Sequence, residues 1–299
     1  MRVTSNDAEL YVEVHGHGDP VLLLHGWPDD AGLWRNQVPA LTEAGFRVIT
    51  PDLRGFGRSA RPADKYAYKL ASSVADVAAV LDAVNGTGAV HVVGHDWGAA
   101  VAWLTAMYLP DRVRTLTVLS VPHLAAPATV RQREMAWYQL FFQFEEIAEA
   151  TLRYNDWATL RELLAGYRDL DRAIANLSRP GALTASLNWY RANLAPHMPG
   201  PRPELPPVKA PTLGIWSDGD RYLDGARMRA SGDLVKGPWR YAEIKGATHW
   251  IPLDAPEVLN TLLIDWLSTS QRDGAGSIAR KSLTGVRRWR PVCPTFPGI

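Results

Sequence analysis

The chain has 299 residues, of which 46% are hydrophobic and 21% are charged, and its formal net charge is +1. This composition is ordinary for a globular protein and gives no indication of binding to nucleic acid or to a membrane surface. The single cysteine, Cys293, excludes an internal disulfide framework and a Cys/His metal cluster. The polar and acidic start of the chain is unlike a signal peptide, and no apolar stretch approaches the length of a membrane span. We therefore expect a soluble, cytoplasmic protein.

The first 120 residues alternate between segments typical of strands and segments typical of helices. Val21–Leu24 is fully apolar, as expected of a strand that is buried on both faces, whereas Glu9–Val14 alternates like an edge strand. The other expected elements are strands at Arg47–Thr50, Ala89–Val93 and Val113–Leu119 and helices at Ser73–Val84 and Ala99–Tyr108. This order predicts a doubly wound, mostly parallel sheet with helices on both faces.

A helical block interrupts this pattern. Residues 130–198 indicate helices throughout and are rich in aromatic residues, and a proline-rich linker, MPGPRPELPPVKAP, follows them. Strand and helix signals then return at Thr212–Trp216, Arg240–Ile244 and Pro256–Leu267. The pattern is that of an α/β core with an inserted helical domain.

Three regions follow from these patterns. We predict an α/β core formed by residues 1–122 and 208–270, and a helical cap with its return linker at residues 123–207. The remaining residues, 271–299, carry six basic side chains and one acidic side chain and show no clear periodicity. We expect them to form a disordered, solvated tail rather than a site for acidic partners.

The segment AVHVVGHDWGAA carries the strongest functional signal. A buried strand leads directly into Gly94-His95-Asp96-Trp97-Gly98, and a helix follows. This spacing is typical of the sharp strand-to-helix turn that presents a nucleophile, where small residues are needed because the strand and the helix crowd one another. An aspartate that only capped the helix would not need a glycine two residues before it and another two residues after it. We therefore predict that Asp96 is a nucleophile.

An aspartate at this position predicts a different reaction from a serine. A carboxylate is a poor nucleophile toward an acyl carbon, but it can displace a leaving group from an alkyl carbon and so become an ester. A base must then activate water to attack the carbonyl of that ester, and an oxyanion hole must stabilise the charge that forms. Asp96 thus disfavours a serine-esterase mechanism and requires a histidine and an oxyanion hole elsewhere in the chain.

A short apolar strand leads into His25-Gly26-Trp27-Pro28. In folds that present a nucleophile on a strand-to-helix turn, a loop at this place supplies the second oxyanion donor. The backbone N–H groups of Trp27 and Trp97 form the expected pair. Pro28 is expected to fix the turn, and a cis Trp27–Pro28 bond would suit it. Alone, the segment is equally compatible with a plain β-turn beside a buried histidine, but its position beside the Asp96 segment favours the oxyanion loop.

The base is expected after the last strand. Among the eight histidines, only His249 has the chain order of nucleophile, acid and histidine that this fold uses. The acid is expected after the strand at Thr212–Trp216, where Asp218 and Asp220 both occur. We prefer Asp220 because the loop usually needs three residues to turn back toward the histidine, and Asp218 is the alternative. The acid orients the imidazole and stabilises its cation.

These residues do not identify the leaving group. A halide needs soft N–H donors such as tryptophan indoles, whereas an epoxide oxygen needs a proton donor as the ring opens. A tyrosine hydroxyl suits the second role because it does not ionise at neutral pH.

Four motifs, HGWPD, DLRGFGRS, GHDWGAA and GATHW, together resemble those of the epoxide hydrolases of the α/β-hydrolase superfamily, and the resemblance covers about residues 5–269. Two cap segments extend it: WYQLFFQ contains Tyr138, and the more specific LNWYR contains Tyr190. The resemblance implies that these two tyrosines hold and protonate the epoxide oxygen.

We expect His25, Pro28, Phe141 and Trp189 to line the substrate pocket. The aromatic side chains of the cap suggest a small, apolar epoxide as the substrate. Water is the only other reactant, and no cofactor, metal, nucleic acid or membrane is expected to take part. The oligomeric state, monomer or homodimer, is left open, as are the natural substrate and its stereochemistry.

Two alternatives are kept. A haloalkane dehalogenase is the first, because a tryptophan such as Trp97 follows the nucleophile in that family too, although dehalogenases resembling this chain would lack the tyrosine pair. A ligand-binding protein without catalytic activity is the second, and it is disfavoured because every triad position is filled.

Overall fold

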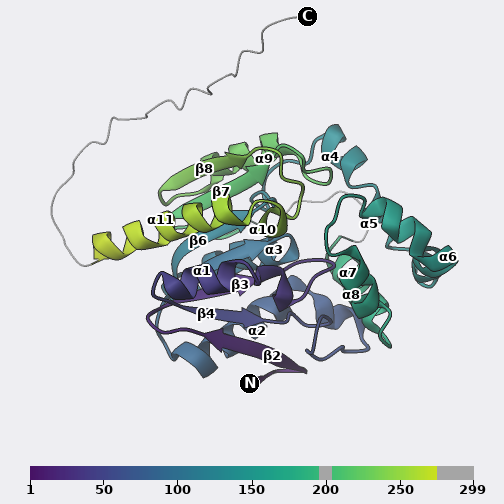
Figure 1. The fold of residues 1–299 in the computed structure, drawn as a ribbon, viewed down its shortest axis with the longest axis horizontal. Helices are drawn as coiled ribbons and strands as arrows, with labels where there is room; N and C mark the ends of the chain where they lie inside the picture. Colours follow the sequence, from purple (N-terminus) through teal and green to yellow (C-terminus); the bar gives the residue numbers. More distant parts are fainter. Residues whose placement is uncertain (195–203, 275–299) are drawn as a thin grey trace, which may run out of the picture.

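The computed structural model describes residues 1–194 and 204–274, which contain an eight-stranded sheet (Figure 1). The strands lie in the order β1-β2-β4-β3-β5-β6-β7-β8. Their bounds are β1 Arg2–Ser5, β2 Ala8–His15, β3 Asp19–Leu24, β4 Phe46–Pro51, β5 Val90–His95, β6 Val113–Leu119, β7 Thr212–Ser217 and β8 Trp239–Ile244. Strand β2 pairs antiparallel with β1 and β4, and all the other pairs are parallel. The predicted mostly parallel sheet is confirmed.

Helices cover both faces of the sheet. Helix α1 packs beside α11 on one face, and α2 packs beside α3 on the other (Figure 1). The helices of this α/β part are α1 Gln37–Glu43, α2 Leu70–Asn85, α3 Trp97–Tyr108, α9 Gly225–Ala230, α10 Ile251–Asp254 and α11 Pro256–Gly274, and short 3-10 turns lie at Ala31–Trp34, Lys65–Tyr68, Pro110–Arg112 and Ser231–Leu234. The central strand β5 is buried at every position, as expected for a strand covered from both sides.

A helical insertion separates β6 from β7. Its helices are α4 Val130–Met135, α5 Tyr138–Phe141, α6 Ile147–Leu163, α7 Leu170–Leu177 and α8 Ala182–Asn193. Figure 1 shows them gathered beyond the end of the sheet toward which the parallel strands run. We call this insertion the cap. It covers the edge at which open parallel sheets bind their ligands.

A buried arginine supports the attachment of the cap to the α/β part. Arg54 donates from Nε and Nη2 to the two carboxylate oxygens of Asp76, at 2.7 and 2.6 Å, and both side chains are buried. This two-pronged pairing compensates two charges that would otherwise be costly to bury. Trp189 on α8 in turn donates its indole N–H to the backbone carbonyl of Arg54 at 3.0 Å. The segment DLRGFGRS therefore fixes α8 to the sheet.

Two expectations from the sequence are wrong. The strand at Glu9–Val14 is not at the edge, because β1 pairs with β2 and takes that place. Helix α11 continues to Gly274, so the first four residues of the predicted 271–299 tail are helical, and the remainder of that tail lies outside the described residues. The predicted boundaries between core and cap stay predictions, and residues 195–203 of the return linker also lie outside the described part.

Candidate active site

The predicted functional residues meet at one edge of the sheet. Trp27 follows β3, Asp96 follows β5, Asp220 follows β7 and His249 follows β8. Because these strands are parallel, their carboxyl ends lie at the same edge and bring the four loops together. The helices of the cap lie beyond the same edge (Figure 1).

The turn at Asp96 is sharp and sterically crowded. Asp96 has φ of 52° and ψ of −123°, in the left-handed half of backbone space that non-glycine residues seldom adopt. A Cβ atom at Gly94 would lie 2.3 Å from the Gly98 carbonyl oxygen, and one at Gly98 would lie 2.1 Å from the carbonyl oxygen of Leu24. Both positions therefore require glycine. The Asp96 side chain makes no capping hydrogen bond to α3, which leaves its carboxylate free for other contacts.

The loop after β3 contacts the Asp96 carboxylate directly. The backbone N–H of Trp27 donates to Asp96 Oδ1 at 2.7 Å. A Cβ atom at Gly26 would lie 2.4 Å from the same oxygen, so only glycine allows this approach. The Trp27–Pro28 bond is cis, as the sequence suggested. Trp97 begins α3, and its backbone N–H is one of the donors that the first turn of a helix leaves unpaired within the helix.

His249 lies between two carboxylates. Its Nδ1 is 2.8 Å from Asp220 Oδ2, and its Nε2 is 3.6 Å from Asp96 Oδ2. Asp220 is itself fixed by the backbone N–H groups of Tyr222 and Leu223, which donate to Oδ1 at 2.9 and 3.0 Å. An acidic side chain thus orients one imidazole nitrogen while the other faces the predicted nucleophile.

The alternative acid, Asp218, has a different role in the structure. Its side chain is exposed, and its Oδ1 accepts the backbone N–H of Gly246 at 2.8 Å. It stabilises the turn that leads back toward His249. The structure therefore places Asp220, and not Asp218, against the imidazole.

The two carboxylates control the ionisation of His249. Burial lowers the pKa of this imidazole, but Asp220 and Asp96 outweigh burial and raise the pKa to about 10. Burial in turn raises the pKa of Asp96, whereas its interaction with His249 and the Trp27 N–H leaves it lower than usual. In the resting site the imidazole is therefore a cation between two anions.

His95 directly precedes Asp96, and the sequence predicts that it packs or hydrogen-bonds behind the nucleophile. Its Nε2 lies 2.9 Å from the backbone carbonyl oxygen of His249, which can only accept a hydrogen bond. Burial, reinforced by the charge of His249, lowers the pKa of His95 to about 4. A neutral His95 therefore donates to the His249 backbone carbonyl and helps to hold His249 in place.

A small cavity opens above the Asp96 carboxylate. Asp96, His249 and Trp27 line it from the sheet side, and Tyr138 on α5 and Tyr190 on α8 line it from the cap. The rings of the two tyrosines are 6.0 Å apart between centroids. Burial and the nearby Asp96 charge raise the pKa of both tyrosine hydroxyls far above neutrality. Both are therefore protonated donors in a site whose floor is a carboxylate.

A sequence model for the α/β hydrolase fold matches residues 19–256. The chain belongs to the α/β-hydrolase family. It is 34% identical to an AB hydrolase superfamily protein of Bacillus subtilis, over 89% of this chain and 96% of the relative. It is 32% identical to epoxide hydrolase A of Mycobacterium tuberculosis, again over 89% of this chain and 96% of the relative.

A solved structure is also similar to this chain. The crystal structure of epoxide hydrolase A from Mycobacterium thermoresistibile superposes with a TM-score of 0.76 at 29% identity, and the match covers 90% of this chain and 97% of that one. Together with the sequence relatives, this makes the protein an epoxide-hydrolase-like α/β-hydrolase.

Two loop residues expected in the pocket of this α/β-hydrolase do not line the cavity. His25 is buried beneath the loop, where its Nε2 accepts the backbone N–H of Leu53 at 2.9 Å. Pro28 is buried within the loop after Trp27 and is not among the cavity residues. Both are buried within the loop after β3 and are not part of the cavity wall.

Two cap residues that were expected to line the pocket also lie elsewhere. Trp189 is fully buried between the cap and the sheet because its indole bonds to the Arg54 carbonyl. Phe141 packs against Trp137 and Phe142 and does not reach the cavity. The residues that complete the lining, and that the sequence did not single out for it, are Leu163, Leu164, Tyr222 and Trp250. Two of them could have been found from their neighbours in the chain, because Tyr222 lies two residues after Asp220 and Trp250 directly follows His249.

The described residues contain no cluster of three or more His, Cys, Asp or Glu side chains that could hold a metal ion. Within the same part of the chain, every helix is too short or too polar to cross a lipid bilayer.

The different contacts of the two aspartates predict different effects of the same substitution. Asp220→Asn should lower kcat at least about 100-fold, because the imidazole loses the carboxylate that orients it and stabilises its cation. Asp218→Asn should leave kcat within about twofold, since it alters only an exposed turn. Turnover of an epoxide by the two purified variants measures the difference, and a greater loss in the Asp218 variant would assign the acid to Asp218 instead.

Proposed function

We propose that the protein is an epoxide hydrolase that converts an epoxide into a vicinal diol through a covalent alkyl-aspartate ester. The observation that carries this proposal is a cavity with an ionised aspartate on its floor and two protonated tyrosines on its roof. The relatives named as epoxide hydrolases support the same reaction. The leucine and aromatic side chains of the lining favour a small, apolar epoxide.

The first step is attack by the Asp96 carboxylate on a ring carbon of the epoxide. A carbon–oxygen bond forms to Asp96 as the ring carbon–oxygen bond breaks. Tyr138 and Tyr190 donate hydrogen bonds to the departing oxygen, and one of them gives it a proton. The high pKa of both tyrosines keeps that proton available until the alkoxide develops.

The second step is hydrolysis of the ester. Water gives a proton to His249 and attacks the carbonyl carbon of Asp96, and the oxyanion accepts hydrogen bonds from the backbone N–H groups of Trp27 and Trp97. Collapse breaks the bond to the diol oxygen, which takes the proton from His249. The proton left on the regenerated Asp96 carboxyl passes to His249 and restores the resting imidazolium, so one epoxide and one water give one diol.

The first step prepares His249 for the second. In the free protein, the Asp96 carboxylate is one of the two negative charges that raise the pKa of His249. Esterification removes that charge, whereas Asp220 keeps the imidazole oriented. The pKa of His249 therefore falls when the ester forms, its proton passes to the tyrosinate left by the first step, and the neutral imidazole becomes available as the base at the stage where a base is needed.

Trapping of the ester tests the covalent mechanism. His249→Gln should form the ester and fail to hydrolyse it, so the intact mass of the protein should increase by the mass of one epoxide. Asp96→Asn is the matched control and should show no increase. In single turnover of the wild type in ¹⁸O-water, the label should enter Asp96 first, and label in the diol without label in Asp96 would contradict an ester.

Removal of the two hydroxyls distinguishes an epoxide from a halide as the leaving group. The double variant Tyr138→Phe with Tyr190→Phe should lose at least about 1,000-fold in kcat with an epoxide, because the alkoxide then has no proton donor. A haloalkane dehalogenase would keep its activity in this variant and release halide. A panel of terminal, trans-disubstituted and aryl epoxides, run beside a haloalkane, makes the comparison.

The charge change at Asp96 predicts a pH dependence. Decay of the ester should accelerate as the pH rises through the pKa of His249 in the ester, because only the neutral imidazole accepts a proton from water. The midpoint should lie below the value of about 10 that the pKa of His249 has beside the ionised Asp96. Quenched-flow decay rates give this midpoint, and decay that slows with rising pH would mean that His249 is not the base.

A further inference from the structure

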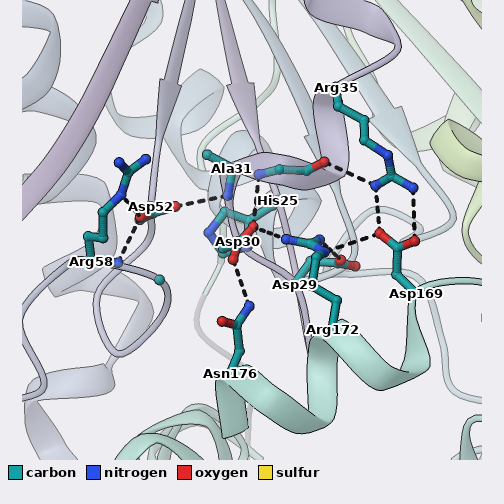
Figure 2. A network of polar contacts seen from close by, with 12 residues as sticks. His25, Asp29, Asp30, Ala31, Arg35, Asp52, Arg58, Asp169, Arg172 and Asn176 are labelled. Carbon is teal, nitrogen blue, oxygen red and sulfur yellow. Dashed lines mark hydrogen bonds and ion pairs between the residues drawn. The ribbon is translucent and has the colours of Figure 1, made fainter. Parts of the chain in front are cut away.

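Asp29 lies two residues after Trp27 and contacts the cap. The residue is 2% exposed, and its Oδ1 accepts hydrogen bonds from the hydroxyl of Tyr167 and from Arg172 Nη2, the latter at 3.1 Å. Tyr167 precedes α7 and Arg172 lies on it, so both donors come from the cap. Figure 2 shows Arg172 reaching from α7 to Asp29 and Asp30. We call Asp29, Tyr167 and Arg172 the Asp29 cluster.

The same cap segment also contacts the loop that carries the base. The ring of Tyr167 stacks on that of Trp250, with 4.3 Å between centroids and 30° between planes. Trp250 directly follows His249, and Tyr167 therefore touches both the loop of the oxyanion donor and the loop of the base. Among the described cap residues, Tyr167 alone combines a hydrogen bond to the loop after β3 with a ring stack on the loop after β8.

The Asp29 cluster buries a carboxyl group at a cost in the free energy of folding. Asp29 Oδ2 is buried, and none of the described residues hydrogen-bonds it. Burial raises the pKa of Asp29 to about 7, although Tyr167 and Arg172 act against that rise. A carboxyl group that is buried with one oxygen unsatisfied lowers the stability of a fold. The contact is therefore better explained by what it positions than by what it stabilises.

The structure points to Tyr167 as a positioning residue that, through Asp29 and Trp250, holds the Trp27 N–H and His249 in register for hydrolysis of the ester. This inference rests on the proposed function. The donor N–H must meet an oxyanion that exists only in the hydrolytic step, so a small displacement of the loop affects that step most. Docking of the cap is thereby coupled to the second half-reaction.

The matched test compares two cap contacts. Tyr167→Phe removes one hydroxyl and keeps the ring on Trp250. Arg35→Gln removes an ion pair to Asp169, at 2.5 and 2.8 Å. This pair also joins the same cap segment to the connection between β3 and α1, but neither of its residues hydrogen-bonds Asp29 or stacks on Trp250. Tyr167→Phe should slow decay of the ester about tenfold and its formation less than about threefold. Arg35→Gln should change neither rate more than about twofold, and urea unfolding checks that both variants fold.

A double-mutant cycle shows whether Tyr167 acts through Asp29. In an Asp29→Asn background, the further change Tyr167→Phe should slow decay by less than about twofold. Independent losses that multiply would overturn the inference, and so would an Arg35→Gln variant that decays as slowly as the Tyr167→Phe variant.

Hydrogen exchange measures how readily the backbone of these loops opens, and it needs no substrate. Backbone amides of residues 24–31 should exchange at least about fivefold faster in the Tyr167→Phe variant than in the wild type, and those in the Arg35→Gln variant should stay within about twofold. Equal exchange in all three proteins would overturn the positioning role even if the wild type hydrolyses epoxides. Failure of the wild type to form an ester or a diol would instead count against the proposed function, whereas the exchange data would still decide the positioning role.

Discussion

The hydrogen bond from the Trp27 N–H to Asp96 Oδ1 is the contact on which the site depends. It joins the loops after β3 and β5, and it forms because three glycines allow the backbones to approach. Gly26 admits the carboxylate, while Gly94 and Gly98 allow the strained turn that presents it. The parallel sheet then brings the loops of Asp220 and His249 to the same edge. The site is thus built from backbone geometry first and from side-chain chemistry second.

Much of the α/β part could be predicted from the sequence because its signals are local. Buried strands are short apolar runs, and an aspartate flanked by Gly94 and Gly98 between a strand and a helix is typical of a turn that presents a nucleophile. The edge of the sheet was harder to predict, since β1 at Arg2–Ser5 has only four residues, which are exposed and buried in turn. The boundary of α11 was also missed, because the residues after Leu267 lose the apolar periodicity that marked the helix.

The cavity lining was the least predictable part. Trp189 is aromatic and adjacent to Tyr190, yet it points toward Arg54, because successive residues on a helix face different directions. Conversely, Leu163 and Leu164 line the cavity, although leucines at the end of a helix carry no distinctive signal. Which face of a cap helix meets the cavity depends on how the cap docks. That docking depends on contacts such as those of Arg54 and Asp29, which join residues more than a hundred positions apart.

The attachment of α8 has a consequence for how the substrate range of such a protein can change. Helix α8 is tied to the sheet side by Trp189 and by Asn193, which donates to the Tyr68 carbonyl at 2.9 Å, and Arg191 is buried against Glu149. Tyr190 therefore lies on a helix that several polar contacts hold in place. At the end of α6, Tyr222 donates its hydroxyl to the Leu163 backbone carbonyl at 2.7 Å, while the cavity wall itself is formed by the apolar side chains of Leu163 and Leu164. Variation at these two leucines can reshape the cavity wall while leaving the Tyr190 hydroxyl in place, so the shape of the cavity can evolve separately from the position of that hydroxyl.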